Sequence, residues 1–71
     1  MTSPARLVQL SDELLHLATR TPAQERLALL LLARQTLSLA ERRGAPPSTL
    51  RSQREWLRAL AQERPGWRAA A

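Results

Sequence analysis

The longest apolar run in this 71-residue sequence is Leu27-Ala28-Leu29-Leu30-Leu31-Leu32-Ala33. Leu and Ala favour helix over strand, which draws instead on β-branched and aromatic residues. At roughly 100° per residue, this run places apolar side chains all around the axis of a helix. Such a helix is normally surrounded by other structure. Two neighbouring helices of a small bundle cover only part of that perimeter, so the run predicts apolar surface left for another protein.

Turn-forming residues mark both ends of this central helix, which we expect over residues 22–43. Thr21 followed by Pro22, with Gln24 at the third helical position, is typical of a capping box. Gly44 should end the helix, because glycine readily adopts the left-handed conformation that follows a helix C-terminus. The prolines that come next prevent its continuation.

Helices are predicted on both sides of the central one. The first, over residues 4–19, begins with Ser3 as N-cap and Pro4 as the first helical residue, and has one apolar half. The third should cover residues 48–64, and we assign no structure to the tail, 65–71. The whole chain is therefore predicted to be one all-α domain: a helical hairpin plus a third helix, completed by oligomerisation or by a partner.

The composition argues against an enzyme. The chain has no cysteine, so disulfides and cysteine zinc sites are excluded. A single histidine, His16, cannot build a histidine-based metal cluster. Two glycines do not make a glycine-rich phosphate loop. We therefore expect no catalytic residues, no metal, no cofactor and no small-molecule substrate.

Two features of the sequence indicate location. The longest apolar run is far shorter than the roughly 20 residues that a membrane-spanning helix needs. The N-terminal residues do not show a cationic stretch followed by an apolar core. We expect a soluble, cytoplasmic protein with no membrane insertion.

A protein partner or a second copy of the chain is the expected ligand of the central helix. We predict that Leu30 points into the core, whereas Leu27 and Leu31 make the outer contact. Trp56 and Trp67 are the only aromatic residues, and tryptophan is enriched at binding hot spots. Trp56 alternatively fills volume at the edge of the core.

Arginines of the third predicted helix form a stripe at Arg51, Arg54 and Arg58. Arginines at this spacing can follow an acidic protein surface or a phosphate backbone, or they can simply face solvent. The formal net charge of +5 suits an anionic partner. The preferred function is a non-catalytic interaction protein: an adaptor, a regulator or a small subunit of a larger assembly.

Residues 39–51 resemble the helix-turn-helix of bacterial DNA-binding regulators and transposase-like proteins. Ala40, Gly44 and Leu50 stand at the spacing of the alanine, the turn glycine and the aliphatic residue of that motif. The resemblance implies a recognition helix whose DNA-facing residues would be Ser48, Thr49, Arg51, Ser52 and Arg54. A small DNA-binding regulator is therefore the alternative function.

Overall fold

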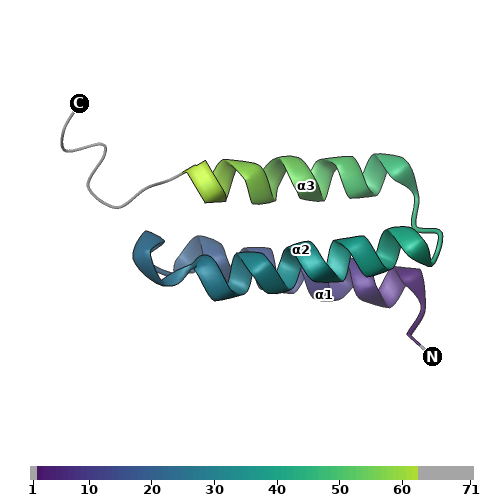
Figure 1. Cartoon of the computed structure of the whole chain (residues 1–71), viewed down its shortest axis with the longest axis horizontal. Coiled ribbons are helices and arrows are strands. Elements are labelled where there is room, and N and C mark those ends of the chain that lie inside the picture. The colour runs from purple at the N-terminus through teal and green to yellow at the C-terminus, as the bar shows by residue number, and fades with distance from the viewer. Residues whose placement is uncertain (1, 63–71) are drawn as a thin grey trace.

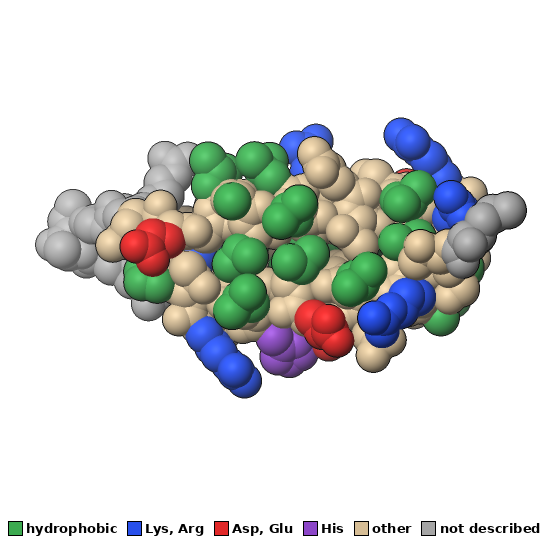
Figure 2. Space-filling view, turned by 90° about the horizontal axis from the view of Figure 1, so that it is seen from below, with side chains coloured by type: hydrophobic (Ala, Val, Ile, Leu, Met, Phe, Trp, Pro, Cys, Tyr) green, Lys and Arg blue, Asp and Glu red, His purple; other side chains and the backbone are tan. Residues whose placement is uncertain are grey.

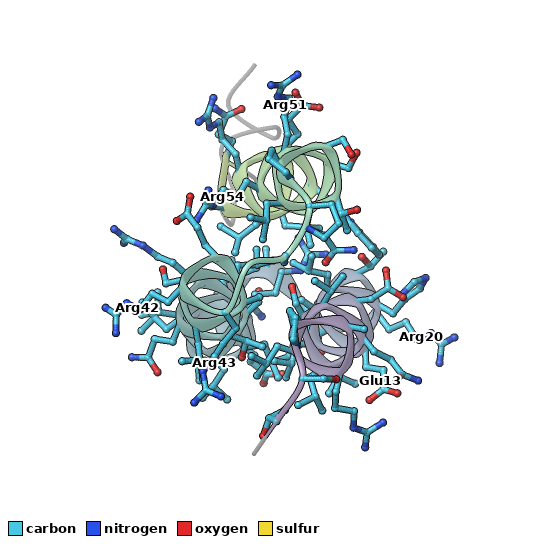
Figure 3. All side chains as sticks on the ribbon, turned by 90° about the vertical axis from the view of Figure 1, so that its right-hand side faces the viewer. Glu13, Arg20, Arg42, Arg43, Arg51 and Arg54 are labelled. Carbon is cyan, nitrogen blue, oxygen red and sulfur yellow. The ribbon has the colours of Figure 1, made fainter. Side chains whose placement is uncertain are left out.

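Three α-helices account for most of residues 2–62, which are the residues that the computed structural model describes. They are α1 (Pro4–Arg20), α2 (Leu27–Arg42) and α3 (Pro47–Gln62). Helices α1 and α2 lie side by side as an antiparallel hairpin, and α3 returns along them (Figure 1). Viewed end-on, the three helices occupy the corners of a triangle (Figure 3). The predicted all-α fold is confirmed.

Helix α1 begins as the sequence predicts. The Ser3 hydroxyl oxygen accepts a hydrogen bond from the backbone N–H of Arg6 at 3.2 Å, and Pro4 is the first helical residue. An N-cap of this kind satisfies one of the backbone donors that the first helical turn leaves free. The helix ends at Arg20, one residue beyond the predicted 4–19.

The predicted start of the central helix at residue 22 is wrong. Thr21 does not cap α2: its hydroxyl donates to the Leu17 carbonyl at 2.7 Å, and it is the C-cap of α1. A short 3₁₀ turn, η1 (Ala23–Glu25), follows before α2 begins. The physical reason is Arg26, whose Nε donates to the carbonyls of Ala18 at 2.6 Å and Thr21 at 2.8 Å. This guanidinium gives a donor to the Thr21 carbonyl and a second one to the Ala18 carbonyl, which also accepts the backbone N–H of Thr21 at 3.2 Å.

The end of α2 follows the prediction closely. Gly44 has φ of 92°, which is the left-handed conformation that glycine adopts most readily. The N–H of Ala45 donates to the Ala40 carbonyl at 3.0 Å, and that of Gly44 donates to Glu41 at 3.1 Å, which together make a Schellman motif. Pro47 then opens α3, one residue before the predicted start. The predicted end of this helix at 64, and the tail 65–71, lie outside the described residues.

The core consists of two apolar clusters, one toward each end of the bundle. Near the α2–α3 turn it contains Leu7, Leu37, Ala40, Ala45 and Leu50. Toward the opposite end it contains Leu15, Ala18, Leu30, Ala33 and Leu60. Between Leu7 and Leu15, one turn from each, lies Ser11, which is fully buried. A polar side chain therefore interrupts the apolar stripe of α1 at mid-height.

Candidate protein interface

Five large leucines of the hairpin remain exposed among residues 2–62. The exposed fractions are 51% for Leu17, 69% for Leu27, 47% for Leu31, 50% for Leu32 and 36% for Leu39. Four of these leucines belong to α2. The bundle thus covers only part of the perimeter of this helix.

Inward and outward positions on α2 agree with the sequence prediction. Leu30, Ala33 and Leu37 are buried in the core, whereas Leu27 and Leu31 are exposed. Both predicted contact residues are therefore accessible to a partner.

A continuous apolar surface lies on the side of the hairpin that faces away from α3, and we call it the hairpin face. Figure 2 shows hydrophobic side chains gathered across the middle of this side, with charged side chains around them. Its centre is a groove of about 320 Å³ between α1 and α2. The groove is lined by Leu10, Glu13, Leu14, Leu17, Leu32 and Thr36.

The hairpin face was not found by sequence reasoning. Leu17 belongs to the apolar half of α1, which we expected to be buried as a whole. Leu32 was one of several leucines in a run that is apolar on every side. The missing information was the position of α3, which covers one side of the hairpin and leaves the other bare (Figure 1).

The predicted arginine stripe does not lie uniformly in solvent. Arg51 points away from the bundle, whereas Arg54 leans from α3 toward α2 (Figure 3). There Arg54 Nη2 donates to Glu41 Oε1 at 2.9 Å, and Nη1 approaches Glu41 Oε2 at 3.4 Å. This hydrogen bond, together with the positive charge, lowers the pKa of Glu41, and the same bond raises the pKa of Arg54.

Arginines also flank a second groove, of about 340 Å³, between α2 and α3. We call it the α2–α3 groove, and its lining residues are Arg34, Leu37, Arg54, Leu57, Arg58 and Ala61. Arg54 and Arg58 also line an adjoining hollow that extends toward Pro47 and Arg51. This hollow is lined by the acidic Glu41 and Glu55 as well. Two members of the predicted stripe therefore border apolar surface, and they do so together with an arginine of α2.

Trp56 lies on the other side of α3, against α1. It packs at the margin of the core, and its ring meets the ring of His16 edge-on with centroids 4.7 Å apart. The core-edge interpretation of Trp56 therefore holds, and Trp56 lies apart from the arginine groove. Trp67, the second predicted anchor, falls outside the described residues.

Polar side chains join α1 to α3 beside this aromatic pair, and we call them the polar seam. The buried Ser11 hydroxyl donates to Gln53 Oε1 at 2.9 Å. The Gln53 amide in turn donates to Asp12 Oδ1 at 3.1 Å. Sequence reasoning did not identify this seam, because its partners are more than forty residues apart.

Helix α1 carries a histidine beside the polar seam. His16 is exposed, and its Nδ1 lies 2.9 Å from the carbonyl and 3.3 Å from a carboxylate oxygen of Asp12 one turn earlier. Within residues 2–62, no three histidine or acidic side chains gather closely enough to hold a metal ion. The seam accounts for its own hydrogen-bonding groups and serves to attach α3.

The helix-turn-helix resemblance has a geometric consequence that can be compared with the fold. In that motif the two helices cross at about 90–120°. Here α2 and α3 lie antiparallel along their lengths (Figure 1). Among the implied DNA-facing residues, Ser48, Arg51 and Ser52 are exposed, whereas Thr49 is half-buried and Arg54 is held by Glu41.

Comparisons with known proteins give no relative for this chain: no protein-family model, no curated protein and no solved structure matches it. Among the described helices, none combines the length and the apolar character needed to cross a membrane.

Proposed function

We propose that this chain is a non-catalytic protein–protein interaction module, acting as an adaptor, a regulator or a small subunit of a larger assembly. It binds a protein partner or a second copy of itself through the exposed leucines of the hairpin. The arginine-rich third helix offers a second, charged contact on the other side of the bundle.

One observation carries the proposal: five leucines of a small hairpin are 36–69% exposed, and two of them, Leu17 and Leu32, line one groove. Single exposed leucines are common and need no explanation. A contiguous apolar surface with charged residues around it is the arrangement found at protein interfaces. Fully burying an exposed leucine contributes about 1.5–3 kcal/mol, and each of these leucines could contribute the part of it that matches its exposed fraction.

The test is sedimentation and native mass spectrometry of the purified chain and of variants on α2. Leu32→Glu and Leu31→Glu should weaken association while helix content by circular dichroism is retained. Leu30→Glu should unfold the chain, because it places a charge in the core. Ser52→Glu adds a negative charge at an exposed position of α3, away from both sides of α2, and should leave association unchanged.

The outcome distinguishes the two exposed sides of α2. A larger effect of Leu32→Glu assigns the contact to the hairpin face, whereas a larger effect of Leu31→Glu assigns it to the originally predicted side. A chain that is monomeric at high concentration, and that purifies without a bound protein, would contradict the proposal.

The DNA-binding regulator stays an alternative prediction, and we do not advance it as a second proposal. No specific observation favours it, because α2 and α3 are antiparallel and Arg54 is engaged by Glu41. Its consequence is enrichment of a defined motif from a pool of random duplexes, with binding that falls steeply with salt.

A further inference from the structure

We infer that the α2–α3 groove binds an acidic amphipathic helix of a partner protein. The inference rests on the proposed function and deepens it by assigning a partner chemistry to the arginine-rich third helix. It concerns a different surface from the hairpin face.

The α2–α3 groove combines an apolar lining with positively charged edges. Its apolar lining consists of the fully buried Leu37, the half-buried Leu57 and the exposed Ala61. Its edges are cationic on both sides, with Arg34 on α2 and Arg58 on α3. An apolar floor between two cationic edges complements a helix that carries leucines on one stripe and carboxylates beside it.

The charges of the groove are not balanced within the described part of the chain. Glu41 is engaged by Arg54 at 2.9 Å. Among residues 2–62, no acidic side chain lies within ion-pair distance of Arg34, Arg51 or Arg58. Carboxylates of a partner would supply the missing charge, and arginine binds a carboxylate through two parallel hydrogen bonds.

The dimensions also favour a helix. The hollow near Pro47 and Arg51 shares Arg54 and Arg58 with the groove, so the two together follow α3 from residue 47 to residue 61. Arginines line both, and the hollow also contains the carboxylates of Glu41 and Glu55. At about 1.5 Å per residue, the two together extend over roughly 20 Å, the length of a helix of about 14 residues.

An acidic protein segment fits the groove better than nucleic acid does. A phosphate backbone does not contact apolar side chains favourably. Single-stranded nucleic acid is bound by stacking of its bases on aromatic side chains. Trp56, the aromatic residue of α3, faces α1 and the His16 ring rather than the groove. Arg54 leans onto Glu41 and does not project outward as a phosphate-contacting arginine would (Figure 3).

The experiment measures fluorescence anisotropy of a labelled model peptide of about 16 residues, long enough to span the groove. The peptide carries leucine on one helical stripe and glutamate beside it. A scrambled peptide of identical composition keeps the charge and lacks the stripe. A duplex DNA of similar total charge is titrated in parallel.

We expect the amphipathic peptide to bind the full chain and the scrambled peptide to bind much more weakly. Arg34→Glu and Arg58→Glu should each weaken binding roughly tenfold or more, because like charges facing each other across an interface are strongly unfavourable. Arg6→Glu makes the same charge change on α1, outside the groove, and should change affinity by less than about twofold. A peptide with lysine in place of glutamate should bind the Arg34→Glu/Arg58→Glu double variant.

Several outcomes would overturn the inference. Equal binding of the scrambled peptide would show attraction by charge alone. If Arg6→Glu weakened peptide binding as much as the groove variants do, binding would not depend on the groove. If the DNA bound more tightly than the peptide, with the same dependence on Arg58, the arginines would be phosphate contacts instead. If the peptide fails to bind while Leu32→Glu still disrupts an assembly, only the groove assignment fails. If the peptide binds and the chain is otherwise monomeric and without a protein partner, the hairpin face loses its role instead.

Discussion

Helix α3 contacts the two helices of the hairpin through different kinds of side chain. Toward α1, α3 is held by hydrogen bonds: Gln53 accepts one from the buried Ser11 hydroxyl and donates one to the Asp12 carboxylate. Toward α2, an apolar floor is flanked by arginines, of which only Arg54 has an acidic side chain within ion-pair distance among the described residues. In the polar seam, the buried polar groups all have hydrogen-bond partners within the described residues. The α2–α3 groove, in contrast, leaves apolar surface and positive charge accessible to another molecule.

The difference separates contacts that stabilise the fold from a surface that is available for binding. Polar groups that are buried between helices cost stability unless they are paired, and in the polar seam they are paired. Unpaired cations beside an open apolar groove do not stabilise the bundle. Binding of a partner is therefore expected on the side of α3 that faces α2, and not on the side that faces α1.

The largest expected effect tests whether the floor of the α2–α3 groove belongs to the core. Leu37 is 1% exposed and packs in the cluster near the α2–α3 turn. Leu37→Ala should destabilise the fold by about 2–5 kcal/mol, through lost burial and the cavity that remains. A chain of this size has a net stability of about 3–5 kcal/mol, so a large unfolded population should appear. Denaturant unfolding followed by circular dichroism measures the change.

The matched control for this prediction is Leu31→Ala on the same helix. Leu31 is 47% exposed, so the change should stay within about 0.5 kcal/mol. Equal effects at the two positions would mean that the assignment of inner and outer sides of α2 is wrong.

The sequence was sufficient to predict the helices, because their signals are local. Ser3, Gly44 and the prolines act within a few residues of their own position, and the composition rich in Leu and Ala left no competing strand. The exception is the start of α2. It depends on Arg26 reaching back to the carbonyls of Ala18 and Thr21, and a guanidinium contact of that kind has no local pattern.

The candidate surfaces could be predicted only in part, because exposure depends on how the helices are placed. Leu31 was correctly assigned to the outside, since it lies about 100° around the helix from Leu30 and about 120° from Leu37. Leu17 and Leu32 could not be assigned without the position of α3. The stripe of arginines was visible as spacing, but the pairing of Arg54 with Glu41 joins two helices and has no signature in either.

A second prediction addresses the polar seam itself. Gln53→Ala removes the acceptor of the fully buried Ser11 hydroxyl and the donor to Asp12, and should cost about 1–3 kcal/mol. Ser11→Ala combined with Gln53→Ala removes both partners and should lose less stability than the two single changes together. The double-mutant cycle, measured by chemical denaturation, should therefore give a coupling of about 0.5–3 kcal/mol.

Independence of these two positions would contradict the seam. In that case the Ser11 hydroxyl would be satisfied elsewhere, for instance by the backbone carbonyl one turn earlier on α1. Gln35→Ala, at an exposed position of α2, is the control for loss of a glutamine side chain and should be close to neutral.

The smallest expected effect concerns the ion pair at the edge of the α2–α3 groove. The Arg54 guanidinium lowers the pKa of Glu41 in the folded chain, chiefly through the hydrogen bond between them. A carboxyl whose pKa is lower when folded stabilises the fold at pH values above its unfolded pKa of about 4.3. That contribution is lost as the pH falls through the lower, folded pKa. Because the side chains of Arg54 and Glu41 are 42% and 58% exposed, solvent keeps the effect small.

Glu41→Gln should therefore reduce stability slightly at pH 7, and the difference from the unmodified chain should vanish in strong acid. Added salt should shrink the difference at pH 7, because exposed pairs are screened. Glu55→Gln makes the same charge change on α3 outside this pair and should not reproduce the pH dependence. Paired pH titrations of the unfolding midpoint provide the measurement. A stability difference that persists at low pH would mean that Glu41 acts through packing and not through its charge. The contact between α2 and α3 would then stabilise the fold as the polar seam does.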